Sequence, residues 1–214
     1  MAARIEGVKV SATFPTPILV AQLAEFEALN AELARIVLAR EAVQATTRHS
    51  NQGGWQSSWD MLDWGGAPAQ AVVAAAKTVA DRFTADRQGA PAPQAWTAMA
   101  WANINRGGHS NVVHAHGGCY WSGTYYIDDG GCAGGSALGG EFEIHDPRGP
   151  GPAMYAPLLT YALPGMQSVG GSERIPCQAG RLILFPAWLM HGVTPYTGGR
   201  SRISMAFNLG LAEK

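Results

Sequence analysis

The stretch RLILFPAWLMHGVTPYTGGRSRISMAFNLG, residues 181–210, contains apolar runs separated by segments rich in glycine, proline and polar residues. The runs are short and hold β-branched and aromatic residues, which are typical of β-strands. Similar runs recur from residue 94 onward, in QAWTAMAWANINR (94–106), YWSGTYYID (120–128) and GGEFEIHD (139–146). Several short strands with turns between them predict a β-sandwich or barrel for the C-terminal part of the chain.

The first 90 residues are helical in character instead. Apolar residues recur at spacings of three and four between Leu23 and Val37, which predicts an amphipathic helix over about residues 20–42. The alanine-rich segment APAQAVVAAAKTVADRF, residues 67–83, has a proline in its first turn and predicts a second helix over about residues 67–88. Because an amphipathic helix must bury its apolar side, we expect both helices to cover one face of a sheet.

The composition argues against several classes of function. Fifteen basic and sixteen acidic side chains leave a net charge of -1, so we expect no nucleic-acid partner. No run reaches the roughly 18 apolar residues of a membrane span, and the first ten residues lack the apolar core of a signal peptide. We therefore expect a cytoplasmic protein with no membrane partner. Cys119, Cys132 and Cys177 form no C-x-x-C pair and are expected to be free thiols.

Two histidines, His114 and His116, stand one residue apart in NVVHAHGGCYWSGTYYIDD, residues 111–129. On an extended strand such residues project to the same face, roughly 6.5–7 Å apart, so both imidazoles can reach one ion. A third histidine, His191, follows the apolar run of residues 181–186. Two early histidines and one late one, on different strands of a barrel, predict an open metal site. Solvent-facing histidines at a strand end and a zinc cluster that includes Cys119 are the alternatives.

Arg202 begins the last run of β-forming residues. On a strand it shares a face with small and polar residues (Ser204, Ala206 and Asn208), while Ile203, Met205 and Phe207 fill the other face. A guanidinium on a face of small residues has a pocket in front of it, and it favours a bidentate carboxylate. The implied ligand is a small organic acid.

Taken in order, the segments HAH, SGTYYI, GGEFEI, GRLILFP, HGVTPY and RISMAFN resemble the iron(II)- and 2-oxoglutarate-dependent oxygenases, in the branch that includes the prolyl hydroxylases. The resemblance covers about residues 100–209. It implies a mainly β (α+β) fold, a double-stranded β-helix or jelly roll with the N-terminal helices packed on one sheet. We expect one domain over residues 1–214, with an N-terminal strand and helical cover in 1–92 and the metal-binding jelly roll in 93–214.

The resemblance also implies the site residues. The metal-binding positions of the family fall on His114, His116 and His191, and its 2-oxoglutarate-binding arginine falls on Arg202 or Arg200. Arg202 is preferred because an Arg-x-Ser pattern brings Ser204 to the same carboxylate. Tyr126, in TYYID, matches a tyrosine that contacts the co-substrate.

His116 departs from the family pattern, which has Asp or Glu at this position. Three neutral imidazoles leave a divalent site at +2, whereas one carboxylate lowers it to +1, so His116 should strengthen the attraction for a dianion. Three hypotheses remain open: a three-histidine site, a site that binds metal without turnover, or a site in which one histidine is replaced by a carboxylate from Asp128, Asp129, Glu141 or Glu143.

The activity implied by the resemblance is hydroxylation of a C–H bond, with iron(II) as cofactor and 2-oxoglutarate converted to succinate. A three-histidine cupin-type dioxygenase that does not use 2-oxoglutarate and a non-catalytic metal-binding module are the alternatives. No pattern identifies the substrate as a peptide or a small molecule. The tryptophans are expected in the core, with Trp55 or Trp121 as candidates for a substrate-pocket wall. An exposed strand edge would be compatible with a homodimer.

Overall fold

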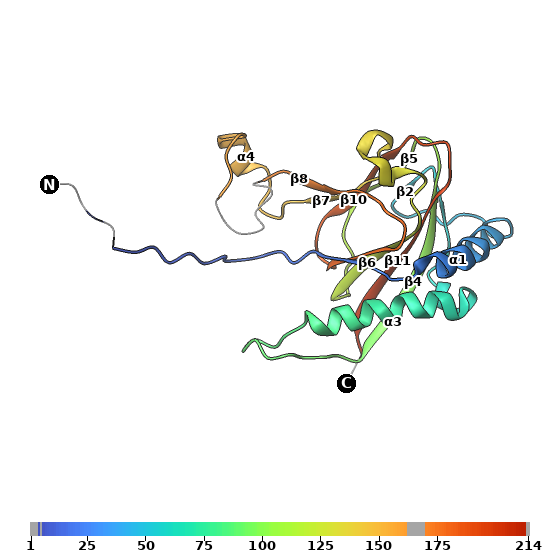
Figure 1. Cartoon of the computed structure of the whole chain (residues 1–214), viewed down its shortest axis with the longest axis horizontal. Helices are drawn as coiled ribbons and strands as arrows, with labels where there is room; N and C mark the ends of the chain where they lie inside the picture. Colours follow the sequence, from blue (N-terminus) through green and yellow to red (C-terminus); the bar gives the residue numbers. More distant parts are fainter. Residues whose placement is uncertain (1–3, 5, 162–169, 213–214) are drawn as a thin grey trace.

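The computed structural model describes residues 4, 6–161 and 170–212, and in them two antiparallel sheets are covered on one side by helices (Figure 1). One sheet has the strand order β1-β9-β6-β11-β4-β3 and the other the order β2-β5-β10-β7-β8. The mainly β fold with helices at its N-terminal end is therefore confirmed.

The strands are β1 (Leu19–Gln22), β2 (Asn51–Gln52), β3 (Trp55–Gln56), β4 (Trp96–Asn105), β5 (His109–His114), β6 (Trp121–Asp128), β7 (Phe142–His145), β8 (Ser172–Ile175), β9 (Arg181–Pro186), β10 (His191–Tyr196) and β11 (Arg202–Leu211). The helices are α1 (Phe26–Glu41), α2 (Met61–Trp64), α3 (Gly66–Arg82) and α4 (Gly151–Tyr155), with short 3-10 turns at Cys132–Gly134 and Ser136–Leu138.

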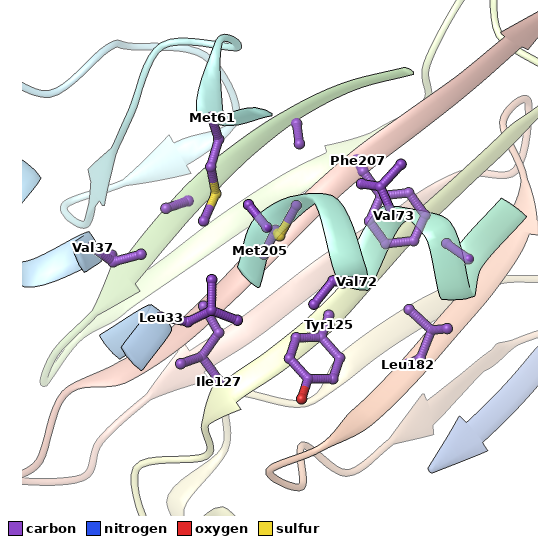
Figure 2. Close-up of a cluster of buried hydrophobic side chains, with 14 of the residues drawn as sticks. Leu33, Val37, Met61, Val72, Val73, Tyr125, Ile127, Leu182, Met205 and Phe207 are labelled. Atoms are coloured by element: carbon purple, nitrogen blue, oxygen red, sulfur yellow. The ribbon is translucent and has the colours of Figure 1, made fainter. Parts of the chain in front are cut away.

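The main core lies between the helices and the six-stranded sheet. Val72 and Val73 of α3 pack over Met205 and Phe207 of β11, and Leu33 of α1 joins the same cluster (Figure 2). The side chains of β11 alternate between the two faces of the sheet: every second one enters this core, and those between them face the other sheet. The helices thus cover one face of the sheet, as predicted.

A second, smaller core lies between the two sheets. It includes Tyr126 of β6 and Phe185 of β9 from one sheet and Phe142 of β7 and Tyr196 of β10 from the other. The rings of Phe142 and Phe185 lie 4.9 Å apart, between their centroids. This layer is where the polar residues of β11 also point, so the functional side chains lie between the sheets.

The first predicted helix begins too early. Leu19–Gln22 form β1, which pairs antiparallel with β9, and α1 begins only at Phe26. Pairing with β9 satisfies the backbone N–H and C=O groups of residues 19–22, which would otherwise need partners within a helix. It also adds one edge strand to the sheet. The long-range pairing with β9 is invisible in a local periodicity.

The second predicted helix ends too late, since α3 stops at Arg82 rather than near residue 88. The Asp86 carboxylate accepts hydrogen bonds from the backbone N–H groups of Gln88 and Ala90, at 2.9 Å each. Such side-chain bonds to the backbone favour a turn over a continued helix. Within the described residues, no helix has the length and apolar character needed to cross a membrane.

Asn30 fastens α1 to the strand that carries Tyr126. Its buried amide donates to the backbone oxygens of Ile127 (2.7 Å) and Tyr126 (3.3 Å), and its amide oxygen accepts from the Tyr125 hydroxyl at 2.6 Å. One side chain therefore satisfies three polar groups of β6 beneath a helix.

Replacing this amide should destabilise the fold. Asn30→Ala leaves buried groups of β6 without partners, so we expect a loss of about 1–3 kcal/mol in the free energy of unfolding. Tyr125→Phe removes one of the three bonds and should cost about 0.5–1.5 kcal/mol. Chemical denaturation of both variants measures the difference, and equal stability of Asn30→Ala and the parent would contradict this account.

Candidate active site

Three histidines converge at one end of the space between the sheets. His114 is the last residue of β5, and it lies opposite His191, the first residue of β10, in the antiparallel register. The ring centroids of these two lie 4.5 Å apart, and that of His116 lies 5.0 and 5.1 Å from them. One ring nitrogen from each histidine lies within 4.8 Å of the others. Two nitrogens bound at about 2.1 Å to one ion lie about 3 Å apart, so small ring rotations bring all three onto one metal.

His116 reaches this position from outside the strand. The prediction that both early histidines lie on one extended strand was wrong, because β5 ends at His114. The backbone N–H of His116 donates to the oxygen of Ala187, 2.8 Å away in the turn between β9 and β10. That turn leads directly into His191, so the same turn holds both histidines in place.

Hydrogen bonds fix the orientation of two of the rings. Nδ1 of His114 lies 2.7 Å from the backbone oxygen of Val112, and Nδ1 of His191 lies 2.8 Å from that of Leu189. A backbone oxygen only accepts, so in both rings Nδ1 carries the proton and Nε2 is left with its lone pair. Nδ1 of His116 lies 3.5 Å from the amide nitrogen of Asn208, whose oxygen accepts from Ser122 at 2.7 Å.

Burial keeps the three imidazoles neutral. Desolvation lowers the pKa of His116 to about 4 and that of His191 to about 3, and it lowers the pKa of His114 in the same direction. The mutual repulsion of protonated rings adds to the effect for His116 and His191. Neutral imidazole is the form that binds a metal, and it suits iron as well as zinc, copper and nickel.

A cavity beside the histidines extends to Arg202. Arg202, Ser204 and Tyr126 line it together with all three histidines. Arg202 is only 2% exposed, and its guanidinium carbon lies 5.0 Å from the centre of the Tyr126 ring. The predicted co-substrate residues are therefore brought together with the histidines around one cavity.

This cavity offers polar groups that lack partners. Within the described residues, Arg202 Nε, the Tyr126 hydroxyl and Asn103 Oδ1 are buried and have no hydrogen-bond partner. Burial raises the pKa of Tyr126 to about 12, so its hydroxyl stays a neutral donor. A buried cation whose Nε lacks a partner, beside a buried hydroxyl that also lacks one, fits an anionic ligand with carboxylate groups. The donor set thus suits both iron(II) and 2-oxoglutarate.

Arg200 lies elsewhere. Its side chain is 67% exposed, and it pairs with the Asp128 carboxylate at 3.2 Å. Of the two arginines considered from the sequence, Arg202 lines the cavity.

The alternative ligands suggested by the sequence are likewise occupied elsewhere. Asp129 accepts from backbone N–H groups, and Glu143 accepts from Ser172 and Arg174. Glu141 lies 3.8 Å from Arg174. In the described part of the chain, the metal-binding group holds none of these carboxylates and no cysteine. Cys119, Cys132 and Cys177 are free, as expected.

Trp55 and Trp121 lie in the core, as expected for the tryptophans, and neither lines the cavity, so they are not its wall. Trp55 and Trp121 are buried, and their indole N–H groups bond to Gln44 and Thr84. Trp101 lines the cavity instead, with its ring 5.7 Å from that of His116. The alternation of β4 could have indicated Trp101, since it shares a face with Asn103.

The comparisons with known proteins agree with this geometry. The family described as "Putative 2OG-Fe(II) oxygenase" matches residues 99–208, just over half of the chain. The chain belongs to this family of iron(II)- and 2-oxoglutarate-dependent oxygenases. No curated protein matches it by sequence. The oxygenase is therefore an enzyme that uses iron(II) as cofactor and 2-oxoglutarate as co-substrate, as predicted.

Solved structures show the same fold at low identity. A Pseudomonas putida prolyl-4-hydroxylase is 16% identical with a TM-score of 0.61, over 91% of this chain and 93% of that one. A Trichoplax adhaerens prolyl hydroxylase, in complex with a peptide fragment of hypoxia inducible factor, is 13% identical with a TM-score of 0.63, over 90% and 83%. HygX from Streptomyces hygroscopicus, with nickel and 2-oxoglutarate bound, is 12% identical with a TM-score of 0.55, over 92% and 84%. The double-stranded β-helix fold is confirmed.

The lowered pKa values predict how the stability of the metal-free oxygenase depends on pH. The ordinary histidine pKa is 6.5, so both histidines bind protons below this pH in the unfolded chain. In the folded chain, His116 binds a proton only near pH 4 and His191 only near pH 3. Stability should therefore fall as the pH is lowered from 6.5 toward 4. Asp146, whose pKa Arg148 holds at about 2, contributes only at more acidic pH.

Thermal unfolding in the presence of a chelator measures this dependence. His116→Gln removes one of the titrating groups, so its unfolding temperature should fall less steeply over the same range. An unfolding temperature that stays constant from pH 6.5 to 4 in the parent would contradict the burial of neutral imidazoles.

Proposed function

We propose that this oxygenase hydroxylates a C–H bond of a peptide or small-molecule substrate, with iron(II) held by His114, His116 and His191 and 2-oxoglutarate held by Arg202. Iron(II) and 2-oxoglutarate held there would supply the activation of dioxygen, with one oxygen atom going to the substrate, the other to succinate, and carbon dioxide as the second product. The observation that carries the proposal is the buried Arg202, whose Nε has no hydrogen-bond partner, in the lining of the same cavity as the three-histidine group.

The residues around Arg202 have distinct tasks in this proposal. Its guanidinium pairs with the distal carboxylate of 2-oxoglutarate, and Ser204, two residues along the same face of β11, donates its hydroxyl to that carboxylate. The Tyr126 hydroxyl stays protonated and donates to the co-substrate. Arg200 is left with a surface role because of its exposure and its pairing with Asp128.

Asn208 is proposed as a positioning residue for His116. When Nε2 of His116 faces the metal, Nδ1 carries the proton and needs an acceptor. A half-turn of the Asn208 amide would present its oxygen to Nδ1 and its nitrogen to the Ser122 hydroxyl, which can accept as well as donate.

The composition of the metal-binding group supports the three-histidine hypothesis over the carboxylate hypothesis, because among the described residues the group contains three histidines and no carboxylate. The divalent charge then remains at +2, and the 2-oxoglutarate dianion offsets it, while the Arg202 cation adds a further attraction for the dianion. Membership of the family favours this function over a cupin-type dioxygenase that ignores 2-oxoglutarate and over a non-catalytic module.

Removing the guanidinium should abolish tight co-substrate binding. Arg202→Ala loses a charge-assisted hydrogen-bonded pair, so we expect 2-oxoglutarate to bind about 10- to 100-fold more weakly. The measurement is an anaerobic titration of the iron(II)-loaded protein, following the visible charge-transfer band of a keto acid chelated to iron(II).

Arg202→Lys and Arg200→Ala are the matched variants. Arg202→Lys keeps the buried charge but not the bidentate geometry and should give an intermediate affinity. Arg200→Ala should bind like the parent. A weaker band in Arg200→Ala alone would overturn the choice of anchor, and no band in a parent that binds iron would favour the cupin-type dioxygenase.

A second test addresses His116. Losing a residue that only hydrogen-bonds to a metal ligand lowers metal affinity roughly 10- to 100-fold. His116→Ala removes a ligand itself, so it should lower iron(II) affinity by at least as much. His116→Asp restores the family pattern and should keep iron(II) after desalting, while its lower site charge weakens 2-oxoglutarate binding. Iron content is measured by elemental analysis.

Cys119→Ala is the control for the zinc hypothesis, because Cys119 is not part of the metal-binding group. It should leave the iron content unchanged. Loss of metal from Cys119→Ala, with His116→Ala unaffected, would overturn the three-histidine assignment.

A further inference from the structure

A second cavity, of about 320 Å³, also has His116 in its lining. We call it the outer groove, and its large side chains are His49, Trp59, Met99, Trp101, His116 and Asn208. The volume is at the lower end of the roughly 300–1,000 Å³ of small-ligand pockets. It suits a single ring-sized group better than an extended surface.

The cavity beside the three histidines, which we call the cofactor cavity, and the outer groove are lined by the same pair of strands. On β4, Met99 lines the groove, Trp101 lines both cavities and Asn103 lines the cofactor cavity. The register of β4 with β11 sets Met99 opposite Asn208 and Asn103 opposite Ser204. The two cavities are thus consecutive parts of one trough on the β4–β11 pair, with His116 in the lining of both.

Aromatic rings connect the outer groove to the metal-binding group. The Trp59 ring lies edge-on to His49, at 5.9 Å between centroids, and His49 lies 6.4 Å from His114. The backbone oxygen of Trp59 accepts from the N–H of Ala100, so this wall is attached to β4. A ligand between Trp59 and Trp101 would lie against a metal-facing imidazole.

The chemistry of the outer groove selects against charge. Among the residues that the structure describes, its lining contains no Asp, Glu, Lys or Arg, and Arg202 lines the cofactor cavity instead. Trp59 and Met99 are 48% and 46% exposed, which is a large apolar surface to leave to water. The lining offers an ionic group no oppositely charged side chain in exchange for its lost hydration, whereas an uncharged ring would stack on the indoles.

We propose that the outer groove is the substrate subsite and takes an uncharged, ring-bearing group. This inference rests on the proposed function, because the group is the part of the substrate brought beside the metal. Trp59 and Trp101 supply the stacking faces, and the absence of charged lining residues excludes free amino acids, phosphate esters and carboxylates from the same place.

A matched pair of probes tests the proposal. Indole-3-acetamide and indole-3-acetate share one ring system and differ in charge. Their binding to the oxygenase, loaded with zinc(II) and 2-oxoglutarate to prevent turnover, is measured by saturation-transfer NMR. We expect the amide to bind and the acetate to bind about tenfold more weakly or not at all.

Variants locate the probe. Trp59→Ala should weaken binding of the amide about tenfold, and Trp59→Phe, which keeps a stacking face, should recover most of it. Phe83→Ala removes another half-exposed aromatic, just after α3, and should bind like the parent. Equal binding of acetate and amide, or full binding by Trp59→Ala, would overturn the proposal.

Two further measurements distinguish a peptide from a free small molecule as the source of the ring, and the substrate subsite from the proposed function. A capped, uncharged tripeptide with a central tryptophan that binds more tightly than indole-3-acetamide assigns the ring to a peptide, and weaker binding assigns it to a free small molecule; both support the subsite. The anaerobic 2-oxoglutarate band of the iron(II) form, measured in Trp59→Ala, should match the parent. Absence of that band in the parent counts against the proposed function, whereas the probe measurements count for or against the subsite alone.

Discussion

The constraint on which this structure depends is a guanidinium buried between two β-sheets. Arg202 is the first residue of β11 and is almost wholly shielded from water. An arginine keeps its charge when buried, so the surrounding structure must offset the lost hydration. Among the described residues it forms no salt bridge, and its neighbours are the ring of Tyr126 and free thiols. This buried charge without an ion-pair partner is the reason for proposing that an anion binds beside Arg202.

The alternation of β11 makes this burial possible. Ile203, Met205 and Phe207 anchor the strand in the helix-covered core, so the residues between them are directed into the space between the sheets. A shift of one residue in register would exchange the two sets and place the arginine under the helices. The stability of the main core therefore maintains the geometry of the cofactor cavity.

Desolvation acts in the same direction at the histidines. The turn between β9 and β10 and the register of β5 with β10 hold three imidazoles where water is scarce, and their pKa values fall. Neutral rings with Nδ1 bonded to backbone oxygens are oriented ligands before any metal binds. In the proposals made above, Arg202 provides an anion-binding part of the trough, and the outer groove provides a part that accepts uncharged groups.

The sequence by itself determined the class of fold, the three histidines and the arginine, because these depend on local alternation and on residue types in a recognisable order. It determined the two main helices, although not their ends, since β1 is defined by pairing with a strand about 160 residues later in the chain. The Arg-x-Ser pattern favoured Arg202 over Arg200, and the tertiary structure added the physical difference between them, because Arg202 is buried and lines the cavity whereas Arg200 is exposed. The expectation that tryptophans lie in the core held for Trp55 and Trp121, but only the tertiary structure placed Trp59 and Trp101 at the trough. Which face of a tryptophan meets water depends on the sheets that pack around it, and no local sequence pattern contains that information.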